Sequence, residues 1–336
     1  MTILEFQKHI LSWYKAHRRN LPWRNTKNPY HILVSEVMLQ QTQVTRVIPK
    51  YEEFLAVFPT LEKLANAPDK KLLKVWQGLG YWRRAKYLKE IAQILLQKVK
   101  ATNSQNADSS KLEKARAIHF QSSSRKRFCM VPSSNEGKSL SGQTAKLAGV
   151  WTNRYSKISL PERLEALPGI GHYTARALAC FAFNSTEAFL DTNIRRVYLH
   201  FFFPSTRSAR SGQAPKKISD AEILPIAQKA IDTLPSNVAP REWHYALFDY
   251  GATVLKDKKI NKRSKHYIKQ SKFEGSFRSF RTKVMRFFLD KQNQTATTSR
   301  IKRFLKEAQS PYDTEKILTS LKKDGLIKKK RNSYSL

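Results

Sequence analysis

The chain has 336 residues, 40% of them hydrophobic, and its 62 Lys and Arg against 26 Asp and Glu give a formal net charge of +36. This charge favours a polyanionic partner, most simply nucleic acid, over an anionic membrane surface. We expect no membrane partner, because no apolar run approaches the roughly 18–20 residues of a membrane span. The N-terminus shows no secretory pattern. Two cysteines, Cys129 and Cys180, and eight scattered histidines suggest neither a disulfide framework nor a metal site, so we expect an intracellular protein.

The first hundred residues predict helices. Ala85, Leu88, Ile91 and Leu95 recur at helical spacing, and Gly78-Leu79-Gly80 separates this helix from the one before it. Residues 103–158 are instead rich in Ser, Asn, Gln and Lys and lose all periodicity. We expect a flexible insertion there, because such a composition buries little apolar surface. A DNA-contacting or localisation arm is the alternative.

Helical patterns return at Pro161. The segment Leu167-Pro168-Gly169-Ile170-Gly171 is followed directly by a predicted helix from Thr174 to Phe181. Glycines permit a tight turn, and the free N–H groups and dipole of the helix start favour an anion such as a DNA phosphate. A turn of this kind can also simply connect two helices.

The last 60 or so residues predict a separate winged-helix-like module, 273–336. Phe280, Val284 and Phe288, then Ile301 and Leu305, then Ile317 and Leu321, mark three helices, with Thr297-Thr298-Ser299 as caps of the second. A short basic hairpin follows from Gly325 to the C-terminus. Its wing could contact phosphates or another protein.

The N-terminal motifs identify a family. The segments Leu21-Pro22-Trp23-Arg24, Ser35-Glu36-Val37-Met38-Leu39-Gln40-Gln41-Thr42 and Trp76-Gln77-Gly78-Leu79-Gly80-Tyr81 resemble the MutY adenine DNA glycosylases of the helix-hairpin-helix superfamily. The resemblance covers residues 5–100 and 160–255.

This resemblance implies four catalytic residues. Glu36 would protonate the extruded adenine, and its apolar neighbours fit an acid that stays protonated near neutral pH. Asp191, which from local pattern alone could be only a helix N-cap, would stabilise the positive charge growing on the sugar, and Asn193 would orient the site. Tyr173 replaces the lysine of related lyases and implies a monofunctional enzyme.

The resemblance also implies DNA contacts. Gln41 and Tyr81 would wedge into the duplex beside the flipped base, while Arg19, Leu21 and Trp23 would line the adenine pocket. The remaining contacts expected with the DNA backbone come from the hairpin, Leu167, Gly169, Gly171 and Thr174, and from the basic run 256–272, Lys262, Arg263 and Lys265.

The chain departs from the family in four places. The register of the four cysteines that hold an iron–sulfur cluster in most members gives Leu255, Lys262, Lys265 and Ser271, so thiolate ligation is impossible and we expect no cofactor. The module at 275–336 is too short to be the Nudix-like reader of 8-oxoguanine. Thr192 replaces a usual Gly, and Tyr245 replaces a polar side chain that faces the purine.

Together these features predict an all-α, two-lobed glycosylase. Residues 1–27 and 187–272 would form one lobe and 28–186 a six-helix lobe that holds the hairpin and the insertion. We expect a DNA-associated monomer, in a bacterial cytoplasm or a eukaryotic nucleus, that excises adenine mispaired with 8-oxoguanine or guanine. The alternatives are a thymine or uracil mismatch glycosylase of the same fold and a non-catalytic DNA-binding protein.

Overall fold

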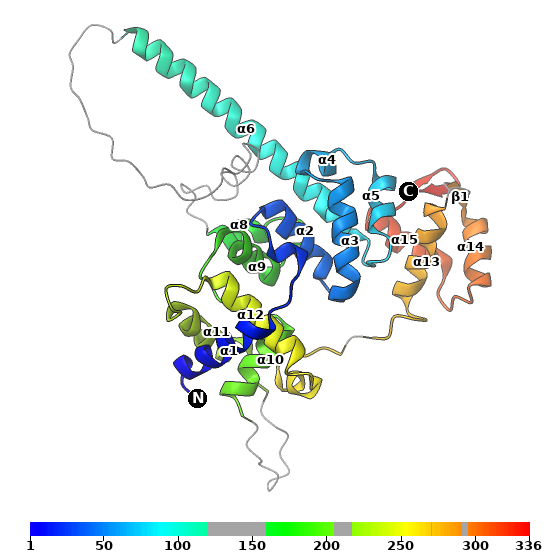
Figure 1. Ribbon diagram of the computed structural model, residues 1–336. Helices are drawn as coiled ribbons and strands as arrows, with labels where there is room; N and C mark the ends of the chain where they lie inside the picture. Colours follow the sequence, from blue (N-terminus) through cyan, green and yellow to red (C-terminus); the bar gives the residue numbers. More distant parts are fainter. Residues whose placement is uncertain (120–158, 205–216, 270, 291–294) are drawn as a thin grey trace.

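The computed structural model of the protein describes residues 1–119, 159–204, 217–269, 271–290 and 295–336. Helices dominate these ranges, as the sequence predicts (Figure 1). None of the helices in them has the length and apolar character that a bilayer crossing would need.

One group of helices gathers around α1 and carries the N-terminus (Figure 1). α1 starts with a capping box between Thr2 and Glu5. The ring centroid of its Phe6 lies 5.4 Å from that of Tyr198 and 5.5 Å from that of Trp243. This aromatic cluster joins helices that are distant in sequence. The members of the group are α1 (Ile3–His17), α10 (Thr192–Phe202), α11 (Asp220–Asp232), α12 (Pro240–Thr253) and the 3-10 helix η2 (Lys258–Arg263).

The second group is built around α2 (Pro29–Leu39), which starts at the Asn28 cap and is buried over nearly its whole length. An apolar helix of this kind has neighbours on all sides. α2 packs against α3, α6 and α9. The other members are η1 (Pro22–Arg24), α3 (Val44–Val57), α4 (Leu61–Ala65), α5 (Asp69–Trp76), α6 (Arg83–His119), α8 (Leu160–Glu165) and α9 (His172–Phe183).

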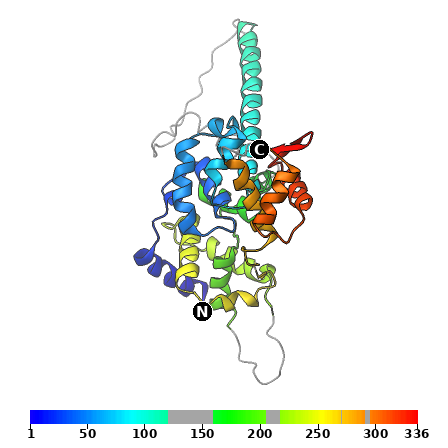
Figure 2. The ribbon, with the colours of Figure 1, turned by 90° about the vertical axis from the view of Figure 1, so that its right-hand side faces the viewer.

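Helix α6 corrects part of the expectation for the insertion. It runs without a break to His119 and projects from the body of the molecule (Figures 1 and 2). Residues 103–119 are therefore helical and extend the preceding amphipathic helix, although their apolar periodicity is lost. Residues 120–158, the rest of the predicted flexible insertion, lie outside the described residues.

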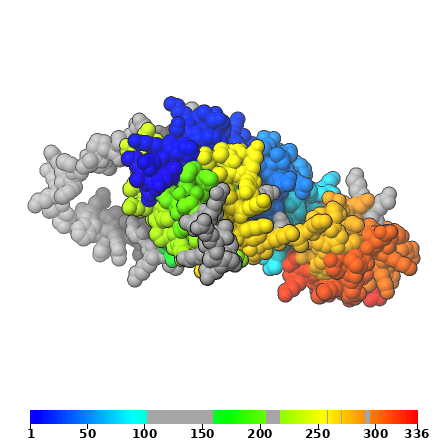
Figure 3. Space-filling view, turned by 90° about the horizontal axis from the view of Figure 1, so that it is seen from below, coloured from blue at the N-terminus to red at the C-terminus, as the bar shows by residue number. Residues whose placement is uncertain are grey.

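The C-terminal module has the predicted three helices and wing. α13 (Phe277–Leu289), α14 (Thr298–Glu307) and α15 (Thr314–Lys323) surround a core that includes Val284, Phe288 and Ile317. The strands β1 (Thr295–Thr297), β2 (Lys328–Lys330) and β3 (Ser333–Ser335) form an antiparallel sheet of order β1-β3-β2, which the hairpin prediction captured without β1. Seen from below, the module is a lobe at one end of the molecule (Figure 3). The predicted fold class is thus confirmed.

Candidate active site

Glu36 lies in the last turns of α2 and is only 5% exposed. The Tyr173 hydroxyl, from the first turn of α9, donates to its Oε2 over 3.4 Å. Burial raises the pKa of Glu36 to about 8, and nearby Asp191 acts in the same direction, whereas the Tyr173 hydrogen bond and the Arg24 charge act in the opposite direction. The carboxyl group is therefore protonated at neutral pH, as a general acid must be.

Asp191 is the N-cap of α10, and the same carboxylate faces the site. Its Oδ1 accepts from the backbone N–H of Asn193 at 2.9 Å and of Ile194 at 2.6 Å, while Asn193 Nδ2 donates to Oδ2 at 3.0 Å. Burial raises the pKa of Asp191, but these N–H groups and the Arg195 charge stabilise its ionised form. The N-cap interpretation of Asp191 is therefore confirmed. It is compatible with the catalytic role that the resemblance implies, because a capping carboxylate can also stabilise a cation in front of the helix.

One cleft of about 1040 Å³ contains both carboxylates and opens between the two groups of helices. Tyr173 and Asn193 also line it, as do all three residues predicted for the adenine pocket. Leu21 and Trp23 present buried apolar surface there. Of the predicted DNA contacts, the cleft is lined by Gln41, Gly171 and Thr174, whereas Tyr81, Leu167, Gly169, Lys262, Arg263 and Lys265 are not among its lining residues.

Arg19 and Arg24, which line the cleft, share a buried counter-ion that the sequence motifs did not predict. The fully buried Asp249 accepts two hydrogen bonds of 2.8 Å from Arg24 and one of 2.5 Å from Arg19 Nε. The Arg24 guanidinium in turn lies 4.5 Å from the centroid of the Tyr245 ring. Asp249 thereby fixes two of the arginines that line the cleft. The contacts span more than 220 positions, so no local pattern could indicate them.

Gln41 and Tyr81, the residues predicted to insert into the duplex, lie on two turns that are both hydrogen-bonded to Arg84. Gln41 and Tyr81 both have left-handed backbones, with φ of 55° and 45°. The buried guanidinium of Arg84 donates to the carbonyls of Met38 and Gln40 at the end of α2, and to those of Leu79 and Gly80 before Tyr81. This clamp fixes the turn after the Glu36 helix against the turn that carries Tyr81.

The hairpin of the predicted helix-hairpin-helix, residues 167–171, connects α8 and α9. Gly169 has φ of +71°, and a Cβ there would lie 2.2 Å from the Tyr87 ring, so glycine is required at this position. Gly171 caps α9 without a side-chain hydrogen bond, which leaves N–H groups for an anion. Leu167 and Thr174 are buried, and Thr174 accepts from Gln40 Nε2 at 3.1 Å, so its hydroxyl already has a partner inside the protein.

The basic run requires one correction. Arg263 donates to the carbonyls of Leu199 and Phe203 at the end of α10, so its guanidinium caps that helix instead of extending toward DNA. Lys262 and Lys265 are exposed. Leu255 is buried, and its carbonyl accepts from Arg196, which also binds Gly251 O and Asn261 Oδ1. Arg196 and Arg263 therefore hold this loop against α10 and α12, and its side chains at 255, 262, 265 and 271 offer no thiolate.

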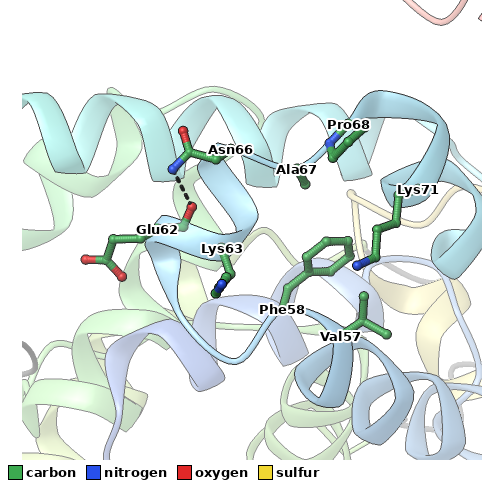
Figure 4. Close-up of a pocket in the computed structure, with 8 residues that line it drawn as sticks. All are labelled: Val57, Phe58, Glu62, Lys63, Asn66, Ala67, Pro68 and Lys71. Atoms are coloured by element: carbon green, nitrogen blue, oxygen red, sulfur yellow. Dashed lines mark hydrogen bonds between the residues drawn. The ribbon is translucent and has the colours of Figure 1, made fainter.

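A second hollow, of about 410 Å³, lies between α3, α4 and α5 (Figure 4). Lys71 extends over the Phe58 ring, 5.8 Å from its centroid, and Asn66 donates to the Glu62 carbonyl. Its lining has one carboxylate and none of the predicted site residues. The cleft that holds Glu36 and Asp191 is therefore the candidate active site.

Comparison with known proteins assigns the chain to a family. A family model described as the HhH-GPD superfamily base excision DNA repair protein matches residues 34–220. This stretch is more than half of the chain and includes Glu36, Tyr173 and Asp191. The chain belongs to the HhH-GPD superfamily.

Curated relatives confirm the resemblance to the MutY-type enzymes. The adenine DNA glycosylase of Buchnera aphidicola subsp. Baizongia pistaciae is 30% identical over 76% of this chain and 54% of that protein. That of Mycolicibacterium smegmatis is 30% identical over 73% of this chain and 61% of that protein, and that of Rattus norvegicus is 27% identical over 75% and 38%. The chain thus spans roughly half the length of these relatives. Among solved structures, a thermostable thymine-DNA glycosylase is 22% identical over 76% of this chain and 89% of that chain, with a TM-score of 0.49.

Proposed function

We propose that the protein is a monofunctional adenine DNA glycosylase, which removes adenine mispaired with 8-oxoguanine or guanine and leaves an abasic site. The observation that carries this proposal is the contrast between Glu36 and Asp191 in one cleft. Glu36 accepts one long hydrogen bond, whereas Asp191 accepts three shorter ones, two of them from backbone N–H groups. Two carboxyl groups whose environments differ in this way are suited to separate acid and anion roles.

The chemistry follows from these roles. Glu36 gives its proton to a ring nitrogen of adenine, so that the base departs neutral as the N-glycosidic bond breaks. The ionised Asp191 stabilises the oxocarbenium-like sugar, and water then adds to the anomeric carbon and loses a proton. Tyr173 offers a phenol and no amine, so no Schiff base forms and the strand is not cut by this enzyme.

Adenine must leave the duplex before this chemistry can occur. Gln41 and Tyr81 are the side chains we assign to the space vacated beside it, and Arg84 fixes both turns. Arg19, Leu21 and Trp23 line the part of the cleft we assign to the base. The curated relatives, named adenine DNA glycosylases, support adenine as the base.

We also propose that this enzyme works without an iron–sulfur cluster. The proposal rests on the chemistry of Leu255, Lys262, Lys265 and Ser271, which offer no thiolate, and on the hydrogen bonds with which Arg196 organises the loop. The exposed Lys262 and Lys265 are the candidates for backbone contact there.

Single-turnover excision tests the function. Duplexes with A opposite 8-oxoguanine, A opposite G, A opposite T and T opposite G are incubated with excess enzyme, and abasic product is read after alkaline cleavage. We expect release from the first two alone. General acid catalysis typically contributes about 10²–10⁴-fold, so Glu36→Gln should slow release by that factor, and Asp191→Asn should abolish it.

Three outcomes would overturn the proposal. Release of thymine from the T:G duplex would assign a mismatch glycosylase of the other specificity. Binding without release from any duplex would favour a non-catalytic DNA-binding role. Cleavage before alkaline treatment would remove the monofunctional assignment.

A further inference from the structure

The C-terminal module is attached to the helix-hairpin-helix lobe beside Tyr81. Asp324, at the end of α15, accepts from Arg83 of α6 at 3.2 Å and also from Arg281 of α13. Arg278 of α13 donates to the Tyr81 hydroxyl, and its guanidinium lies 5.2 Å from the centroid of that ring. α13 also packs against α5. The module therefore has a fixed position next to one of the residues assigned to the DNA interface.

The surface of this module is strongly cationic. Residues 273–336 contain sixteen Lys and Arg against six Asp and Glu, and Asp324 is already neutralised by two arginines. All three residues of β2 are exposed lysines, and the exposed Arg331 follows in the turn. On α15, Ile317, Leu318 and Leu321 are buried in the core, while the residues of the opposite face, Lys316, Thr319, Lys322 and Lys323, are exposed.

The arrangement fits duplex DNA. α14 and α15 form a helix-turn-helix, in which the second helix is the one that enters a major groove, and the β2–β3 hairpin follows directly. Lys322 and Lys323 precede Asp324, which contacts Arg83, two residues from Tyr81. The basic face thus starts close to the wedge turn.

We propose that this module is a second duplex-DNA contact, in which α15 and the β2–β3 wing bind phosphates of the DNA that flanks the extruded base on the Tyr81 side. The contacts of Arg278 with Tyr81 and of Asp324 with Arg83 fix the position of the module relative to the cleft. The inference rests on the proposed function only for the position of Tyr81 at the DNA. A protein partner of acidic surface is the competing occupant.

Salt-dependent binding to an undamaged duplex tests the proposal, because this probe requires no adenine chemistry. The variant Lys328→Ala/Lys329→Ala/Lys330→Ala removes three wing charges. The control Lys8→Ala/Lys15→Ala/Lys229→Ala removes three exposed lysines of α1 and α11. The slope of log K against log salt concentration is negative, and each lost phosphate contact reduces its magnitude by about 0.9. We expect a reduction of about 0.9 for each wing lysine that contacts a phosphate, and no change for the control.

Duplex length gives the second measurement. Shortening the flank that the module contacts in a mismatched duplex should weaken the binding of the wild type severalfold. The affinity of the wing variant should not change over the same lengths, because the variant no longer contacts that flank. Equal slopes for the wing and control variants, or equal sensitivity of wild type and wing variant to flank length, would overturn the proposal and leave an acidic protein as the occupant. If adenine release fails while the magnitude of the slope still falls, the proposed function is wrong and the DNA contact stands.

Discussion

The Tyr173 hydroxyl lies 3.4 Å from Oε2 of Glu36 and donates to it. A hydrogen bond to a carboxylate stabilises the ionised form, whereas burial stabilises the protonated form. Burial has the larger effect here, so the pKa of Glu36 is raised to about 8. Tyr173 thus limits how far the pKa of the acid rises.

The first prediction concerns Tyr173→Phe. This change removes the hydrogen bond that lowers the pKa of Glu36 and keeps the ring that packs on Phe189, with centroids 5.7 Å apart. The acid should then remain protonated to a higher pH, so the alkaline limb of the single-turnover excision profile should move upward from pH 8. Tyr30→Phe is the matched control, since it removes a buried hydroxyl that donates to the Phe58 carbonyl, and neither residue lines the cleft. An alkaline limb that stays in place, or moves downward, would contradict the role of Tyr173.

The second prediction concerns stability and the same carboxyl group. The folded pKa of Glu36 is about 8 and its ordinary value is 4.5. Below pH 4.5 the group is protonated in both states, and above pH 8 it is ionised in both. Between these values folding must take up a proton, so the wild type loses stability relative to Glu36→Gln as the pH rises, and the difference levels off above pH 8.

Urea unfolding of both proteins between pH 4 and 9 measures this difference. The Gln variant should become more stable than the wild type by several kcal/mol at high pH, because each pKa unit corresponds to about 1.4 kcal/mol. Glu53→Gln, at an exposed position paired with Lys50, serves as the control and should give no such trend. A difference that does not depend on pH would show that Glu36 is ionised in the folded protein.

The third prediction tests how α12 supports the Asp191 region. A Cβ at Gly251 would lie 2.4 Å from the backbone oxygen of Asn193, which cannot rotate away. Helix propensity alone would make Gly251→Ala stabilising by about 0.5–1 kcal/mol, whereas overpacking costs about 1–3 kcal/mol. We expect a lower melting temperature and slower excision, because the start of α10 and the Asp191 cap must shift. A more stable variant with full activity would contradict this packing.

The sequence predicted those parts of the site that lie within short motifs. Glu36, Tyr173 and Asp191 were assigned from the resemblance of short segments to the family, and the structure brings them into one cleft. Periodicity located α9 and α13 because their buried faces recur at helical spacing. The arginines that hold the site together were not predicted. Arg84 and Arg278 act through carbonyls and a hydroxyl distant in sequence, and such contacts leave no local pattern. The hydrogen bonds of Arg263 to the end of α10 were not predicted either, because a basic run does not reveal which cation turns inward.

The last prediction concerns the buried ion cluster behind the cleft. Asp249 accepts from Arg19 and Arg24 with its carboxylate fully buried. Burial alone would raise the pKa of Asp249, but the hydrogen bonds and charges of the two arginines outweigh it and lower the pKa below the ordinary 3.8. The cluster therefore stabilises the protein above pH 3.8, and this contribution is lost only as the pH falls through the lowered value.

Asp249→Asn should reduce the free energy of unfolding at pH 7 by about 3–5 kcal/mol, because it leaves the buried Arg24 without its counter-ion. Excision should also slow, since Arg24 would lose its position over Tyr245. Asp69→Asn is the control, because Asp69 pairs with Lys86 and Lys89 at the partly exposed surface, where an ion pair contributes about 0–1 kcal/mol. Chemical unfolding and single-turnover excision of both variants measure the two effects. Equal losses in the free energy of unfolding would mean that burial does not strengthen the Asp249 ion pairs. An unchanged excision rate in Asp249→Asn would mean that Arg24 keeps its position without Asp249.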